Sequence, residues 1–315
     1  MRRALAVLAA LGMVTIAVLV RNGLDDDDGG DGGDGNGASG VVVCATDLAS
    51  ACQELDDSVE VRIEDPAVTA AALAEGSLAD DVDAWVASTA WLEVAESRAP
   101  GSLGESQALA TSPAVVATAP GRYEAISDLC DGEDIWQCLG DAAGTDWGSL
   151  GDGSHADWHE LKVGLTDPDL AVGLPGLASA SAGFFGTTDF ATNDPRWGDF
   201  EAWLANLAAP SANGDPDAAK TLATRQGTYS AAGSIGAIAD QYEGRGVDSI
   251  APEVPVAATV AIVEIDGGDG APEADGIRDT LIDAGWARAD KDDLAPTLNP
   301  GVMAALHSLW RDVTK

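Results

Sequence analysis

Basic residues are scarce in this chain, which has 16 lysines and arginines against 53 aspartates and glutamates in 315 residues. The formal net charge at pH 7 is −37. Because binding to a phosphate backbone requires a basic face, this scarcity excludes a nucleic-acid partner. The excess of acid keeps a protein soluble and repels anionic surfaces, but it does not specify a fold.

Motifs that carry catalysis are also missing. The chain has only three histidines, no G-x-S-x-G or H-E-x-x-H sequence occurs, and the glycine string 227-GTYSAAGSIG-236 lacks the G-x-G-x-x-G register of a nucleotide fingerprint. A serine hydrolase needs a nucleophile, a base and an orienting group, so few partners remain for any serine. We therefore expect a protein that is not an enzyme and has no cofactor or metal. The alternative is a metal-dependent hydrolase using His155 and His159, which are four residues apart.

Charge is absent from residues 4–20, ALAVLAALGMVTIAVLV, which follow a start of Met-Arg-Arg. A helix of this length rises about 1.5 Å per residue and just crosses a thin hydrocarbon core. No small-x-small cleavage site lies immediately before Arg21, so we predict an N-terminal transmembrane anchor over 1–21 in preference to a cleaved signal peptide. Both interpretations place residues 22–315 outside the cytoplasm, either on the extracellular face of the membrane or secreted.

Cysteines are few, and their spacing is not that of a metal knuckle. Cys44 and Cys52 are eight residues apart, and so are Cys130 and Cys138. The lack of any C-x-x-C sequence disfavours zinc, and an oxidising compartment favours disulfides. Four cysteines allow three connectivities, which the sequence cannot resolve. We favour the two local pairs because each pair brackets a turn.

Short apolar runs and helix-patterned segments alternate beyond residues 22–40, which form an acidic Gly/Asp linker by composition. The patterns predict strands at 41–43, 59–63, 83–87, 114–118, 161–165 and 256–265, and helices at 47–55, 67–76, 90–97, 122–130, 174–185, 198–208, 273–285 and 301–313. The glycine-rich 227-GTYSAAGSIG-236 is predicted to be a turn that enters a small-residue helix. This alternation favours an α/β fold with a parallel sheet and helices on both faces.

Small polar residues stand where the predicted strands give way to helices: Thr46-Asp47, Ser88-Thr89, Thr111-Ser112 and Thr166-Asp167. Ligands of open α/β sheets bind at such ends, because backbone N–H groups and helix dipoles converge there. Ordinary helix capping by Ser, Thr and Asp explains these residues about as well. Trp91 is a further candidate, since an indole face stacks on sugar rings, and Thr228-Tyr229 could reach the same cleft.

The order of these segments resembles that of solute-binding proteins of the molybdate- and sulfate-binding type. The stretch 45-ATDLASACQEL-55 resembles their first ligand loop, 83-DAWVASTAWLEVA-95 their second, and 111-TSPAVVATAP-120 the first crossing between lobes. The stretch 160-ELKVGLTDPDLAVGLPGLASA-180 resembles their second-lobe strand and helix. The stretch 253-EVPVAATVAIV-263 resembles the return crossover, and 298-LNPGVMAALHSLWRDV-313 the closing helix.

This resemblance implies a type II periplasmic-binding-protein-like fold of two α/β lobes with two crossover strands. Lobe 1 would comprise residues 41–117 and 258–315, and lobe 2 residues 118–257. The resemblance also implies a membrane-tethered extracellular protein that captures a small ligand between its lobes for an ABC-type permease or for sensing. The alternative is a ligand-free interaction or sensor module on the same fold that binds a protein partner.

The ligand-facing residues that the resemblance implies are Thr46, Asp47, Ser88, Thr89, Ser112 and Ala171, the last in the turn 169-DLAVG-173. Two departures from the family pattern disfavour a tetrahedral oxyanion. Asp47 places a negative charge beside the expected ligand, and the run 170–172 offers Leu-Ala-Val where oxyanion binders offer a hydroxyl or small donor. A cationic, neutral or amino-acid-like ligand stays open, as does the absence of any ligand.

Overall fold

The structure is a computed structural model that describes residues 40–55, 58–211, 214–225, 227–268, 270–290 and 298–315. The predicted membrane anchor and nearly all of the predicted acidic linker lie outside these residues. Within the described ranges, none of the helices combines the length and the apolar character needed to cross a bilayer. Residues 38–315 form one compact unit, and the description below concerns that unit.

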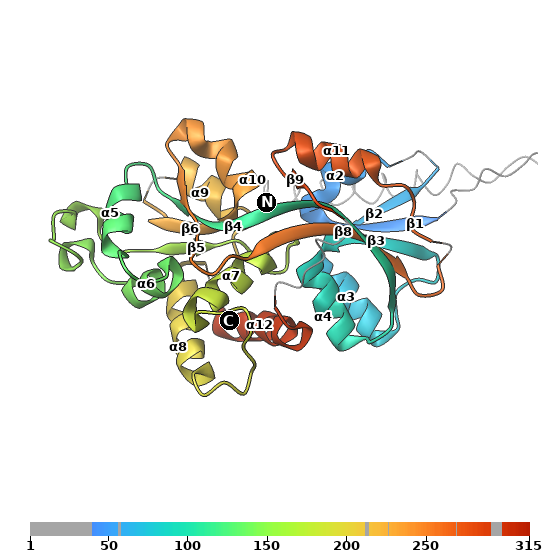
Figure 1. Cartoon of the computed structure of the whole chain (residues 1–315), viewed down its shortest axis with the longest axis horizontal. Helices are drawn as coiled ribbons and strands as arrows, with labels where there is room; N and C mark the ends of the chain where they lie inside the picture. The colour runs from blue at the N-terminus through green and yellow to red at the C-terminus, as the bar shows by residue number, and fades with distance from the viewer. Residues whose placement is uncertain (1–39, 56–57, 212–213, 226, 269, 291–297) are drawn as a thin grey trace, which may run out of the picture. The chain divides into compact units, whose positions relative to one another are not determined.

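One sheet organises the described chain, with the strand order β2-β1-β3-β8-β4-β6-β5, while β7 and β9 pair with β4. Figure 1 shows β4 and β8 side by side, joining the two halves of the sheet. The strands are β1 (Val41–Ala45), β2 (Glu60–Glu64), β3 (Val82–Ser88), β4 (Leu103–Thr118), β5 (Val163–Leu165), β6 (Ala231–Ile235), β7 (Asp248–Ile250), β8 (Ala257–Ile265) and β9 (Ala287–Arg288).

The sheet is mixed, so the prediction of a parallel sheet was wrong. β1 is parallel to β2 and β3, and β5 is parallel to β6. β8 is antiparallel to both β3 and β4, and β4 is antiparallel to β6. Hydrophobic patterning indicates which residues are buried but carries no information on strand direction. Here β8 runs opposite to both of its neighbours, which makes the sheet mixed.

Strand β4 is the bridge between the two halves, which we call lobe 1 (β2, β1, β3, β8, β9 and the first part of β4) and lobe 2 (the last part of β4, β6, β5 and β7). Pro113 makes the last pair of β4 with β8, and Ala114 makes its first pair with β6. Proline has no N–H to give to a ladder, so it is tolerated where the strand changes partners. The predicted lobe boundaries stay a prediction. Residue 117 lies within β4, and residue 258 is the second residue of β8.

Helices flank the sheet in both lobes. Those of lobe 1 are α2 (Ala49–Cys52), α3 (Pro66–Glu75), α4 (Thr89–Arg98), α11 (Asp275–Asp283) and α12 (Pro300–Val313). Those of lobe 2 are α5 (Tyr123–Leu129), α6 (Ile135–Ala142), α7 (Gly173–Phe185), α8 (Trp197–Ala208), α9 (Ala218–Thr224) and α10 (Gly236–Ala239). Helix α12 packs on α4 and also on α7 and α8, so it contacts both lobes.

Short 3-10 turns complete the connections: η1 (Thr46–Leu48), η2 (Trp147–Ser149), η3 (Ala156–Trp158), η4 (Ala209–Ser211) and η5 (Asp240–Arg245). Helix ends follow the sequence signals closely. Pro66 opens α3 one residue before the predicted start, and Gly76 ends the helix with a left-handed φ of 62°, as the pattern predicted. Asn299 caps α12 by accepting a hydrogen bond from the Gly301 N–H.

The prediction of a turn and helix over 227–236 was wrong, because residues 231–235 form the buried strand β6. Its small residues reflect crowding. A Cβ on Gly233 would lie 2.9 Å from side-chain atoms of both Leu165 and Trp136. Alanine, serine and glycine are poor strand formers, so propensity alone pointed away from a strand, and tertiary packing overrode it.

Candidate functional site

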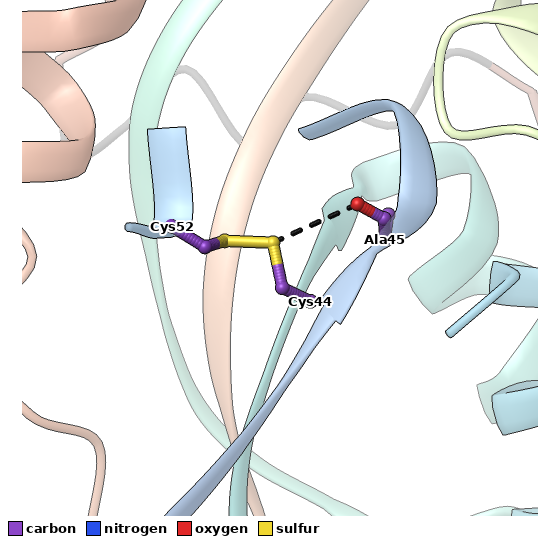
Figure 2. The surroundings of a disulfide bond; sticks show 3 residues. All are labelled: Cys44, Ala45 and Cys52. Carbon is purple, nitrogen blue, oxygen red and sulfur yellow. Dashed lines mark hydrogen bonds between the residues drawn. A yellow bond between two sulfur atoms is a disulfide. The ribbon is translucent and has the colours of Figure 1, made fainter. Parts of the chain in front are cut away.

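Two polar pairs follow neighbouring parallel strands, β1 and β3, at the same edge of the sheet. Thr46 and Asp47 begin the turn η1 directly after β1, and Ser88 ends β3 where α4 begins. The first loop is fixed by the disulfide between Cys44 and Cys52, with Cα atoms 6.5 Å apart (Figure 2). The structure therefore holds Asp47 on a short loop closed at both ends.

The second disulfide joins Cys130 to Cys138, with a Cα–Cα separation of 5.5 Å. The preference for local pairing is thus confirmed for both pairs. Each bridge closes a loop of about eight residues, which removes roughly 2.5 kcal/mol of chain entropy from the unfolded state.

Asp47 bonds directly across to lobe 2. Its Oδ1 accepts a hydrogen bond of 3.1 Å from the Ala171 N–H, and its Oδ2 accepts one of 3.0 Å from the Val172 N–H. Val172 is the N-cap of α7, whose dipole favours a negative charge at this end. Burial raises the pKa of Asp47, while the bonds from Val172 and Ala171 oppose that rise. Asp47 therefore acts here as an acceptor that joins the lobes.

Trp91 and His307 hold the same lobe 2 segment from the other side. The indole N–H of Trp91 donates to the Leu170 carbonyl at 3.0 Å. The Trp91 and His307 rings meet edge to face, with centroids 4.8 Å apart. Trp91 has no exposed surface, so its faces are not open to stack on a sugar in this arrangement. His307 is also buried, and sequence patterning did not select it.

The chemistry of its neighbours fixes the tautomer of His307. Its Nδ1 lies 3.1 Å from Nη2 of Arg98, which can only donate, so Nδ1 is the acceptor. Nε2 therefore carries the hydrogen and donates to Oδ1 of Asp169 at 2.6 Å. That bond lowers the pKa of Asp169, and burial lowers the pKa of Arg98. The result is a series of hydrogen bonds that runs from Arg98 on α4 through His307 on α12 to Asp169 in the turn before α7.

Ser88, which ends β3 three residues before Trp91, carries an unused polar group. Its side chain is 1% exposed, and its Oγ has no hydrogen-bond partner among the described residues. Side chains alternate along β3, so Ser88 shares a face with Val86, which belongs to the apolar cluster that also contains Ala171 and Val172. A buried hydroxyl without a partner costs about 1–3 kcal/mol, which a bound polar group would remove. Thr89 is buried beside it.

The remaining predicted residues have separate surroundings. Ser112 lies inside β4, so its prediction as a strand end was wrong, and its Oγ accepts from the Ala237 N–H at 3.0 Å. Thr46 is exposed and donates to Asp65 at 2.6 Å. Thr228 and Tyr229 line a lobe 2 cavity of about 490 Å³ that contains none of the junction residues.

The histidine pair of the alternative hydrolase does not converge on a common point. His155 stacks on Trp158 with centroids 3.9 Å apart, and His159 is exposed with a φ of 58°. Across the part of the chain that the structure describes, no group of three or more His, Cys, Asp or Glu side chains is placed to hold a metal ion.

Three solved structures resemble the chain over most of its length. AfuA, a periplasmic binding protein from Actinobacillus pleuropneumoniae with fructose-6-phosphate bound, is 11% identical, with a TM-score of 0.53 over 86% of this chain and 96% of its own. The chain has the fold of the periplasmic binding proteins. Iron-bound HitA from Pseudomonas aeruginosa is 12% identical, with a TM-score of 0.52 over 87% of this chain and 98% of its own.

A ferric binding protein from Campylobacter jejuni has a similar structure, at 11% identity and a TM-score of 0.52, over 87% of this chain and 98% of its own. No protein-family model and no curated protein matches the sequence. At such low identity the likeness establishes the periplasmic-binding-protein fold and leaves the ligand open.

Proposed function

We propose that the chain is a solute-binding protein that captures a small molecule between its lobes, without catalysis. One observation carries this proposal. Asp47, Trp91 and His307, from three separate segments of lobe 1, all bond to residues 169–172 of lobe 2, and three residues before Trp91 the buried Ser88 hydroxyl has no partner among the described residues. Sites of this fold class lie where strands end against helix N-termini, which is where this junction lies.

The strands between the lobes supply a hinge. Within the described sheet, the strands β4 and β8 lie at its centre and join the two halves, so a change in their backbone would separate the junction residues. In this proposal the lobes separate transiently to admit the solute and then close on it. A membrane permease or sensor then receives the closed form on the extracellular face, to which the N-terminal segment tethers the protein.

A cation, a neutral molecule or an amino acid is the ligand class that we propose. The net charge of −37 disfavours the approach of an anion, and Asp47 already occupies the N–H groups before α7. The finer resemblance to molybdate- and sulfate-binding proteins stays a prediction. The test below includes both oxyanions in order to decide it.

The test is thermal unfolding of the purified protein against amino acids, polyamines, sugars, oxyanions and divalent metals. A ligand present at about 100 times its dissociation constant adds roughly 2.7 kcal/mol of stability, which raises the melting temperature by a few degrees. We expect one chemical class to act, and we expect Ser88→Ala to abolish that shift without lowering stability. Ser77→Ala, at an exposed serine of lobe 1, is the matched control and should keep the shift.

A second function is favoured by the contacts that already join the lobes. Asp47 and Trp91 bond to lobe 2 in the structure itself, as in a module whose cleft is permanently closed and whose outer surface binds a protein. No response to any compound in the panel, combined with a wild-type scattering curve that never changes, would favour this module over the solute-binding protein.

A further inference from the structure

The amides before α7 are already bound to an anion, and that anion belongs to the other lobe. Both oxygens of the Asp47 carboxylate are used, one by the Ala171 N–H and one by the Val172 N–H. The helix behind them has 13 residues, long enough for its dipole to act on a charge at this end. Asp47 therefore satisfies two N–H groups that would otherwise lack partners inside the helix.

This contact differs from an ordinary helix cap. A capping side chain normally comes from the residue at the helix start, but Val172 has no side chain that can accept. Asp47 precedes it by 125 positions and stands on lobe 1. The bond therefore exists only while the lobes are together, and it breaks whenever they separate.

The carboxylate also has no cation of its own. Among the described residues, no Lys, Arg or His forms an ion pair with Asp47, and the nearby Asp65 adds repulsion that raises its pKa. Its negative charge is stabilised by backbone N–H groups alone. Such a pair of amides at a helix start is also the kind of site that binds a sulfate or phosphate oxygen.

We propose that Asp47 is an internal ligand, a carboxylate that occupies an anion site of lobe 2, keeps the lobes closed without solute and excludes free oxyanions. This inference rests on the proposed function, because it takes the junction to be the solute site. The Ser88 hydroxyl, at the end of β3 three residues before Trp91, is buried and has no hydrogen-bond partner among the described residues, so it is a second polar group that a bound solute would satisfy. Removing the carboxylate should convert the junction into an oxyanion site.

The experiment compares the full-length wild-type protein with Asp47→Ala, using inorganic sulfate and phosphate at constant ionic strength set with chloride. Calorimetric titration should show sulfate or phosphate bound by Asp47→Ala with an affinity roughly tenfold or more above the wild type. Asp65→Asn is the matched control, because it removes a nearby negative charge and leaves the Asp47 bonds in place. It should gain no oxyanion binding.

Hydrogen exchange of the peptide covering 167–175 supplies the second readout. Asp47→Ala should exchange the amides of 171 and 172 faster than the wild type, while the strands of lobe 1 remain protected. Unchanged exchange there, or oxyanion binding that the wild type shares, would overturn the proposal. Faster exchange without any gain of oxyanion binding would also overturn it, since the amides would then not be an anion site.

The outcomes separate this inference from the proposed function. A wild-type protein that responds to no solute, beside an Asp47→Ala protein that gains sulfate, overturns solute capture and supports the internal ligand. A wild-type protein that binds sulfate at the junction supports solute capture and overturns the internal ligand.

Discussion

Glu93 gives the stability of the protein a specific dependence on pH. Its side chain, on α4, lines a cavity of about 350 Å³ in lobe 1. Its Oε2 is buried and, within the described ranges, has no hydrogen-bond partner. Burial raises the pKa of Glu93 from an ordinary 4.5 to about 8. The folded protein therefore holds a proton here that the unfolded chain has already released at neutral pH.

The sign and size of the effect follow from proton linkage. Between pH 4.5 and about 8 the folded state binds more protons at Glu93 than the unfolded state, so stability falls as the pH rises through this window. At about 1.4 kcal/mol for each pH unit the full loss is about 5 kcal/mol. Water reaches part of the side chain, which reduces the expected loss to about 2–4 kcal/mol.

The assay is urea unfolding of the wild type and Glu93→Gln at pH 5.0 and pH 8.5. Glutamine does not titrate, so the variant should exceed the wild type by about 2–4 kcal/mol at pH 8.5 and by much less at pH 5.0. All other titrations are shared and cancel in this difference. Glu96→Gln, one turn along α4 and exposed, is the control for loss of a charge. A difference between Glu93→Gln and the wild type that does not change with pH would refute the reasoning.

Three further predictions concern packing and cross-links. Replacing Cys44 and Cys52 together by serine should lower the free energy of unfolding by about 2.5 kcal/mol in urea titration, and an unchanged midpoint would contradict this. Gly233→Ala should lower the free energy of unfolding by about 1–3 kcal/mol, because its Cβ would lie 2.9 Å from neighbouring side chains. Gly176→Ala, on α7 with no atom within 4 Å of the added Cβ, should raise it by up to about 1 kcal/mol. Equal melting temperatures of the two variants would count against both predictions. His307→Ala should cost about 1–3 kcal/mol by calorimetry, because the half-buried Arg98 and Asp169 lose their hydrogen bonds to the buried imidazole, and a loss below about 0.5 kcal/mol would show that these bonds are not needed.

Local structure could be predicted from the sequence where local chemistry decides it. The helix α3 is an example, since proline at its start and Gly76 at its end both act within one turn. Strand β4 could not be predicted in full. Its first part carries Gly104 and Glu105 and is largely exposed, so it shows no apolar alternation, and pairing with β8 is what makes it a strand.

The candidate site was predicted in part for the same reason. Asp47 was selected from a strand end and from the family resemblance, and Ala171 from the resemblance alone, but their bond joins positions 124 apart that no local pattern relates. His307 was missed although a signal existed. It lies on the buried face of α12 with Met303, Leu306 and Trp310, where a polar side chain indicates a specific partner.

Small-angle X-ray scattering of the wild-type protein and Asp47→Ala, each without and then with added sulfate, tests the central claim most directly. We predict a compact wild-type form that sulfate does not change, and a variant with a larger radius of gyration that returns toward the wild-type value when sulfate is added. Curves that superimpose for both proteins under both conditions would contradict the claim that Asp47 holds two mobile lobes closed around one site.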